Sequence, residues 1–133
     1  MKKVILLLVG VMLFCSAYTQ VTFDTVDEFG AYQSHWALIC VDHKFGFIDT
    51  LGNVVVAPQF DYIEQFGEYK LDWALVSCDG KLGFLNNKGE VVVKPQFDAI
   101  GQFGEYRSDW AAVYIDKKMG FINLEGTLVV GGR

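Results

Sequence analysis

Aromatic and acidic residues recur together at three places in the chain, and they are the side chains best suited to binding. Each place has a Phe-Gly-x-Tyr segment with a Trp four residues after the Tyr, and Glu and Asp flank the rings in the second and third copies. The candidate binding residues are Trp36, Tyr69, Trp73, Glu68, Asp72, Tyr106, Trp110, Glu105 and Asp109. Flat rings beside carboxylates can stack on sugars or anchor a protein partner. Alternatively, the rings pack one copy against the next.

Residues for catalysis or metal binding are sparse in this sequence. It contains no Gly-rich phosphate loop, no Gly-x-Ser-x-Gly, no His-Glu-x-x-His and no Cys-x-x-Cys. The two histidines, His35 and His43, do not recur in the other copies. We therefore expect no enzymatic activity, no metal site and no cofactor, and we interpret both histidines as surface loop residues.

Recurring aspartates have a simpler interpretation as turn residues. One set follows an aromatic residue at the start of each copy, and the other occupies a tight turn 18 residues later; the sets are Asp24, Asp61, Asp98 and Asp42, Asp79, Asp116. Asp side chains readily hydrogen-bond nearby backbone amides. Calcium binding is disfavoured, because no loop carries closely spaced oxygen ligands.

The N-terminal segment has the pattern of a secretory signal peptide. Lys2 and Lys3 precede an uninterrupted apolar run, Val4 to Phe14, and then Cys15-Ser16-Ala17. The run is shorter than the roughly 20 residues of a membrane-spanning helix, so an anchor is the weaker interpretation. Lipidation of Cys15 is disfavoured too, because Phe14 stands where lipoprotein signals have a small residue. We expect residues 1–17 to be removed and 18–22 to form a lead-in.

Export changes the charge and the compartment that the chain meets. Losing Lys2 and Lys3 shifts the net charge from −5 to −7, which disfavours nucleic-acid binding. We expect a periplasmic, cell-surface or secreted protein with no stable membrane span. Cys40 and Cys78 align one register apart, so their side chains should point to opposite faces and no disulfide is predicted.

One 37-residue unit, present three times, accounts for the rest of the chain. The copies are 23–59, 60–96 and 97–133, and Trp, Gly-Phe and turn glycines recur at the same step. Each copy contains an apolar run, a two-residue turn such as Asp79-Gly80, a second apolar run, a Gly turn and a Val-rich run. This pattern predicts three short antiparallel strands per copy. Asp42-His43 and Asp116-Lys117 suit such a turn less well.

Alternation along these strands predicts the core. The first strand has an apolar face and a mixed face that carries the Trp. On the second strand, the apolar face is formed by Phe45 and Phe47 or their equivalents, and the recurrent Gly46, Gly83 and Gly120 lie on the other. We expect an aromatic ring from a neighbouring strand to lie flat on each glycine.

The unit resembles the WG repeat of bacterial proteins. The matching segments are Lys44-Phe45-Gly46-Phe47-Ile48-Asp49 and its equivalents from Lys81 and Lys118, followed in two copies by Pro58-Gln59-Phe60-Asp61 and Pro95-Gln96-Phe97-Asp98. The Trp that names the family is Phe45, Leu82 or Met119 here, each large and apolar. The resemblance implies a β-rich repeat in exported or surface proteins, generally without an assigned enzymatic activity.

Together these patterns predict an all-β protein. Three tandem antiparallel units should form one curved sheet or a barrel-like repeat domain, with Gly131-Gly132-Arg133 as a terminal cap. The leading functional hypothesis is a non-enzymatic binding or scaffolding module of the bacterial envelope that contacts proteins. The alternative is a carbohydrate-binding module that uses the Trp, Tyr, Glu and Asp segments.

Overall fold

The computed structural model describes residues 4–8 and 19–130, with only the backbone described for 4–8, 19–21 and 130. Most of the predicted signal sequence, including Cys15, and the predicted Gly131-Gly132-Arg133 cap lie outside these residues. The chain divides between Phe60 and Asp61 into two compact units. All regular structure in the described residues is β-strand, which confirms the all-β prediction.

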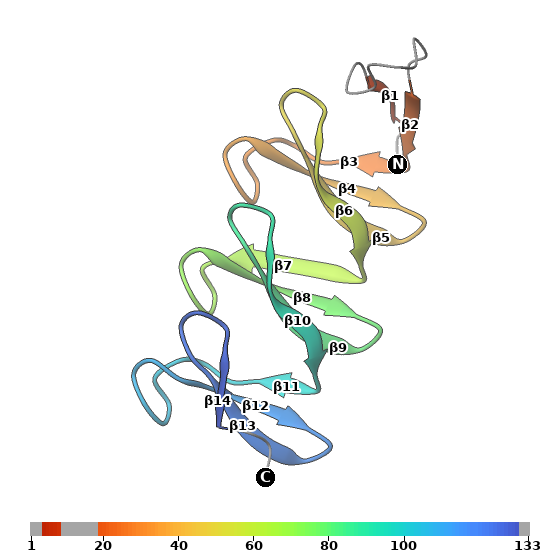
Figure 1. The fold of residues 1–133 in the computed structure, drawn as a ribbon. Helices are drawn as coiled ribbons and strands as arrows, with labels where there is room; N and C mark the ends of the chain where they lie inside the picture. Colours follow the sequence, from red (N-terminus) through yellow and green to blue (C-terminus); the bar gives the residue numbers. More distant parts are fainter. Residues whose placement is uncertain (1–3, 9–18, 131–133) are drawn as a thin grey trace, which may run out of the picture. The chain divides into compact units, whose positions relative to one another are not determined.

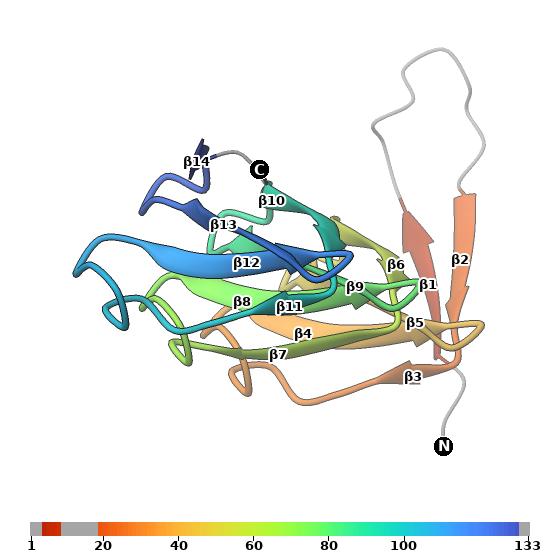
Figure 2. The same cartoon turned by 90° about the horizontal axis from the view of Figure 1, so that it is seen from below.

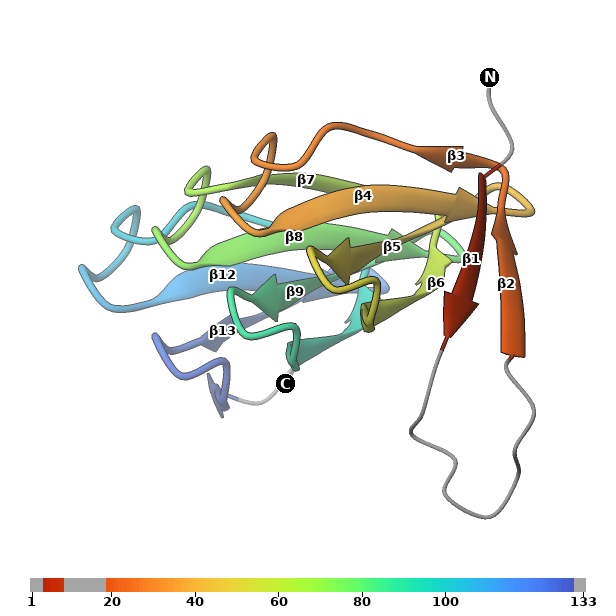
Figure 3. The same ribbon diagram turned by 90° about the horizontal axis from the view of Figure 1, so that it is seen from above.

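The first unit contains a hairpin and a four-stranded sheet (Figure 1). Strand β1 (Val4–Leu8) pairs antiparallel with β2 (Thr19–Phe23), as Figure 3 shows. The sheet follows in the order β3 (Thr25–Val26), β4 (Trp36–Val41), β5 (Lys44–Asp49) and β6 (Val54–Phe60). Phe23, Ala37, Ile39 and Ile48 form its buried core.

The second unit contains two sheets of the same topology. One consists of β7 (Tyr62–Phe66), β8 (Trp73–Cys78), β9 (Lys81–Asn86) and β10 (Val91–Phe97). The other consists of β11 (Ala99–Ile100), β12 (Ala111–Ile115), β13 (Lys118–Ile122) and β14 (Leu128–Val130). One core joins them, because Leu75 and Phe84 cluster with Val113 and Ile122.

These sheets correct two expectations about topology. Each repeat has four strands instead of three. The residues after Asp24, Asp61 and Asp98 form the additional strands β3, β7 and β11, which pair with β4, β8 and β12. Within the described residues, the twelve strands from β3 to β14 form three separate four-stranded sheets instead of one curved sheet. The reason is that each repeat satisfies its ladder hydrogen bonds internally; in the second unit, the two sheets are joined by side-chain packing.

All three tight turns have the conformation that suits a two-residue hairpin, including the two that looked less suitable. Asp42, Asp79 and Asp116 have φ of 51° or 52°, and the next residues His43, Gly80 and Lys117 have φ of 66°, 78° and 66°. The earlier aspartate of each repeat holds the turn: Asp61 Oδ2 accepts the Asp79 amide at 2.7 Å, and Asp98 Oδ2 accepts the Asp116 amide at 2.8 Å. Both aspartate sets are therefore turn residues.

The glycine of the second strand has a different neighbour from the one expected. A Cβ on Gly83 would lie 2.2 Å from the carbonyl oxygen of Val93, and one on Gly46 would lie 2.2 Å from that of Val56. At Gly46 and Gly83 the closest neighbour is thus the bulged backbone before the proline of the fourth strand, in place of the expected aromatic ring. The glycine lets that bulge fold over the strand.

The predicted mixed face is also buried in the second repeat. Trp73 and Leu75 on one face of β8, and Ala74 and Val76 on the other, are each at most 3% exposed. At the family's Trp position, Phe45 and Leu82 are half-buried while Met119 is exposed. The apolar face of the second strand is therefore less well covered in the third repeat.

Candidate binding surface

Eight of the nine predicted binding residues lie in the loops that lead into β8 and β12 or at the start of β8, at the same end of the second unit (Figure 2). The ninth, Trp36, begins β4 of the first unit. The loop before β8 is fixed by its backbone. Gly67, with φ of 97°, donates its amide to the Trp73 carbonyl at 3.1 Å, and the Trp73 amide donates to Lys70 at 2.9 Å. The equivalent bonds of Gly104 and Trp110 are 3.2 and 3.1 Å long, so the two loops share one conformation.

Each loop anchors its Tyr and Trp on the Phe of the second strand. In the second repeat the ring centroids of Tyr69 and Trp73 lie 5.2 and 5.0 Å from that of Phe84. The first and third repeats have the same cluster, with distances between 5.0 and 5.3 Å; its members are Tyr32, Trp36 and Phe47, and Tyr106, Trp110 and Phe121. Packing within the repeat is thus the common role of these rings.

Burial separates the candidate rings by position. Trp36 is 9% and Trp73 3% exposed, which leaves their faces covered, and Tyr69 is half-buried. Trp110 is also half-buried, whereas Tyr106 is 61% exposed. Among the described loops, the third therefore offers the most accessible of the predicted rings.

Two of the predicted acids form ion pairs with a cation that covers the Trp. Lys70 Nζ lies 2.6 Å from Asp72 Oδ1 and 5.0 Å from the centroid of the Trp73 ring. In the third repeat, Arg107 Nε lies 2.8 Å from Asp109 Oδ1 and Arg107 Cζ lies 5.0 Å from the Trp110 ring. The hydrogen bond from Lys70 lowers the pKa of Asp72. Each cation therefore lies over the face of the Trp ring in its own repeat, in the geometry of a cation–π contact.

The remaining predicted acids, Glu68 and Glu105, are exposed. Glu105 turns back over its own repeat, since a Cβ on Gly101 would lie 2.6 Å from its Oε1 atom. Near it, a hydrogen bond with the Tyr106 hydroxyl raises the pKa of Tyr114. The third loop thus places an exposed ring, a half-buried ring and a carboxylate together.

Comparison with known protein families gives a match to the WG containing repeat at residues 45–81 and 83–118, more than half of the chain. The chain belongs to the WG containing repeat family. In this member of the family, Gly46 and Gly83 are the glycines that admit the bulged fourth strand. The family assignment agrees with the resemblance predicted from the repeated segments.

Other comparisons add little to this assignment. No curated protein matches the chain. Among solved structures, the crystal structure of HIRA(644-1017) is similar with a TM-score of 0.39 and 10% identity over 86% of this chain. The chain spans 41% of that solved chain.

Sequence reasoning missed three residues of these WG repeat loops. Lys70 and Arg107 occupy equivalent positions two residues before an Asp, and this shared step was the signal that could have identified them. Leu71 is 88% exposed and has no apolar equivalent in the other copies, which have Ser34 and Ser108. Its exposure could be learned only from the folded loop.

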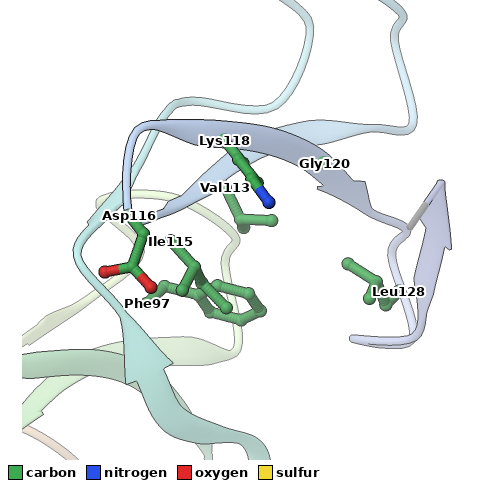
Figure 4. A pocket seen from close by; sticks show the side chains of 7 residues that line it. All are labelled: Phe97, Val113, Ile115, Asp116, Lys118, Gly120 and Leu128. Atoms are coloured by element: carbon green, nitrogen blue, oxygen red, sulfur yellow. The ribbon is translucent and has the colours of Figure 1, made fainter. Parts of the chain in front are cut away.

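Two hollows lie away from the predicted ring and acid cluster. One of about 320 Å³ in the third repeat is lined by residues that include Phe97, Ile115, Lys118 and Leu128 (Figure 4). Another of about 350 Å³ in the first repeat is lined by residues that include Phe29, Ile48, Leu51 and Gly52. None of the nine predicted binding residues lines either hollow.

Within the described residues, no group of three or more His, Cys, Asp and Glu is placed to hold a metal ion. Cys40 and Cys78, both half-buried, form no disulfide with any described residue. A search of residues 4–8 and 19–130 also finds no helix long and apolar enough to cross a membrane.

Proposed function

We propose that this WG repeat protein is an exported, non-enzymatic binding or scaffolding module of the bacterial envelope that contacts other proteins through its β7–β8 and β11–β12 loops. The observation that carries the proposal is the exposure of Leu71 and Tyr106, at 88% and 61%, on loops whose backbone is held by the Gly and Trp hydrogen bonds. Exposed apolar and aromatic side chains on a preorganised support bind with little loss of conformational entropy.

Charges next to these residues favour a protein partner. Lys70 and Asp72 flank Leu71 in sequence, and Arg107 follows Tyr106, so each apolar contact is surrounded by groups of both signs. An apolar centre with a polar, charged rim is the usual composition of a protein interface. The partner should therefore present an apolar residue within a mixed-charge surface.

Export is supported by the N-terminal sequence. Lys2 and Lys3, the apolar run to Phe14 and the small residues before Tyr18 are typical of a cleaved signal. Cell fractionation and the mass of the exported protein test this part. An N-terminus at or near Tyr18 in an envelope or secreted fraction is the expected result, and intact protein in the cytoplasm would contradict it.

A carbohydrate ligand is the second candidate, and the third repeat favours it. Tyr106 is exposed, Trp110 is half-buried, and Glu105 and Asp109 supply carboxylates beside them. Sugar rings stack on such aromatic faces. The buried rings of Trp36 and Trp73 offer no equivalent platform in the first two repeats.

The binding experiment uses Leu71→Ser and Tyr106→Ser, with Leu51→Ser as the matched control. Leu51 is 83% exposed, nearly the same as Leu71, but lies in a turn of the first repeat. Envelope proteins captured by the wild type should be retained by Leu51→Ser and reduced on the order of tenfold by the two loop changes. Equal capture by all variants would contradict the protein-binding proposal. A sugar retained from a glycan array, and lost with Tyr106→Ser, would favour the second candidate instead.

A further inference from the structure

Four pairs of residues form the contact between the second and third repeats. Phe103 packs its ring on Trp73 at 5.8 Å, and Lys81 forms an ion pair with Asp98. Phe97 pairs with Leu82 in the ladder. Val92 lies against Gly126, where an added Cβ would be 2.8 Å from its carbonyl oxygen. Each pair joins one residue of the second repeat to one residue that begins or belongs to the third.

The residues of the third repeat that are equivalent to Trp73, Lys81, Leu82 and Val92 lie 37 residues later and are less covered. Trp110 is half-buried where Trp73 is 3% exposed, and Met119 and Val129 are 38% and 39% exposed. Lys118 is exposed and has no ion-pair partner among residues 4–8 and 19–130. Figure 4 shows Lys118 extending over the 320 Å³ hollow, with Leu128 and Ile115 on opposite sides.

The first repeat contains the equivalents of the other residue of each pair, namely of Phe97, Asp98, Phe103 and Gly126. Phe29, equivalent to Phe103, is 46% exposed, and Gly52, equivalent to Gly126, lines the 350 Å³ hollow beside Leu51. Asp24 uses Oδ2 to accept the Asp42 amide at 2.8 Å, as Asp98 uses Oδ2 for Asp116. Asp98 Oδ1 also binds Lys81, whereas Asp24 Oδ1 has no cation partner within the described part of the chain.

We propose that the first repeat of one molecule docks on the third repeat of a second copy and reproduces the contact between the second and third repeats. In this interface Phe29 packs on the partner copy's Trp110, and Asp24 pairs with its Lys118. The exposed Val129 of the partner copy enters the hollow at Gly52. The charges are complementary, one hollow lies in each of the two repeats that would meet, and the pattern is that of a head-to-tail interface.

Strand β1 occupies one part of this interface in the intact chain. Val4 pairs with Phe23, as Leu82 pairs with the equivalent Phe97 in the second unit. The N-terminal segment therefore takes the ladder position that Met119 of a second copy would take. In this one respect the inference rests on the proposed export, because removing residues 1–17 frees the edge of β2.

The experiment separates self-association from export and from loop binding. A site-specific protease sequence is inserted after Ala17, the full chain is folded and purified, and sedimentation velocity is measured over a wide range of protein concentration before and after cutting. The intact chain should be monomeric, and the cut chain should form dimers and larger species as its concentration rises. A cut chain that stays monomeric at every concentration would overturn the proposal, whatever the result of cell fractionation.

Variants with matched controls identify the surface. In the cut chain, Lys118→Glu and Phe29→Ser should each weaken association on the order of tenfold. Lys88→Glu makes the same charge change at another exposed lysine, and Tyr62→Ser removes a ring of 42% exposure outside the proposed contact, so both should associate as the wild type does. Asp24→Asn keeps an acceptor for the Asp42 amide but loses the ion pair, and should weaken association too. Unchanged association in Lys118→Glu and Phe29→Ser would show that a different surface is used.

Discussion

The carboxylate of Asp98 accepts a hydrogen bond of 2.8 Å from the amide of Asp116, 18 residues further along the chain. The same carboxylate binds Lys81 of the preceding repeat. One side chain thus holds a tight turn of its own repeat and the hairpin before it. Because the step of 18 residues also joins Asp24 to Asp42 and Asp61 to Asp79, the turn and the start of the repeat are positioned together in all three copies.

This relationship predicts an acid-dependent contribution to stability. The hydrogen bond from Lys81 is the main cause that lowers the pKa of Asp98, and that from Lys70 lowers the pKa of Asp72. A lowered folded-state pKa means that the stabilisation is present above the unfolded value of about 3.9 and is lost as the pH falls through the folded value. Carbon-13 NMR titration should show both carboxyls titrating below the unfolded value, and Lys81→Met should raise the pKa of Asp98 but not that of Asp72.

Glycine at the second turn position should stabilise the first and third repeats. His43 and Lys117 both have φ of 66°, a conformation that costs side chains with a Cβ roughly 1 kcal/mol. Part of that gain is offset by the greater freedom of glycine in the unfolded chain, so we expect His43→Gly and Lys117→Gly each to add about 0.5 kcal/mol. Urea denaturation measures this free energy.

The second repeat supplies the reverse test, because it already has Gly80 with φ of 78°. Gly80→Lys should destabilise by about 0.5 kcal/mol, because the strain of roughly 1 kcal/mol is partly offset by the loss of glycine's freedom in the unfolded chain. If His43→Gly and Lys117→Gly both lowered the free energy of unfolding, backbone strain at the turn would not determine the stability of these repeats.

Gly83, in the second strand of its repeat, should tolerate substitution far less well than the turn glycine Gly80. Gly83→Ala would place a Cβ 2.2 Å from the Val93 carbonyl oxygen, so the bulge of β10 must move, at a cost of about 3 kcal/mol. Gly80→Ala is the control, since no atom lies within 4 Å of its added Cβ. Thermal unfolding monitored by circular dichroism should give the larger loss for Gly83→Ala, and equal losses would argue against the close backbone approach.

Tryptophan fluorescence should distinguish the three aromatic clusters. In variants that keep one Trp and replace the other two with Phe, the emission of Trp36 and Trp73 should be blue-shifted and protected from iodide, because these rings are at most 9% exposed. Trp110, which is half-buried, should be quenched more strongly. Equal quenching at all three positions would contradict this ranking and would support an exposed aromatic platform in every repeat.

Much of the fold follows from patterns visible in the residues. The 37-residue step, the alternation of the Val-rich and Phe-rich runs and the turn residues predict an all-β repeat, and the structure confirms that fold class. The first strand of each repeat was not predicted; in Thr25–Val26 and Ala99–Ile100, two residues carry too little alternation to be recognised. The division into three sheets depends on which strand edges pair, and alternation does not contain that information.

The candidate site was harder to predict than the fold. Sequence analysis grouped Trp73 with Trp110 because the two have the same neighbours, yet Phe103 covers the first ring and has no described equivalent on the second. The cations over the rings were missed because a Lys or Arg in a loop gives no sign of its direction. Equivalent residues thus differ in exposure according to what packs next to them.

The sequence by itself determined the repeated unit, its strand-forming runs and the aspartate and glycine turns, because these depend on local preferences and on a period that can be counted. Only the tertiary structure decided which rings are covered, why Gly83 must be glycine and which residues of the third repeat lack a partner. Those properties depend on atoms brought together from distant positions in the chain. Burial and close approach are properties of such contacts, so equivalent segments acquire different roles in successive repeats.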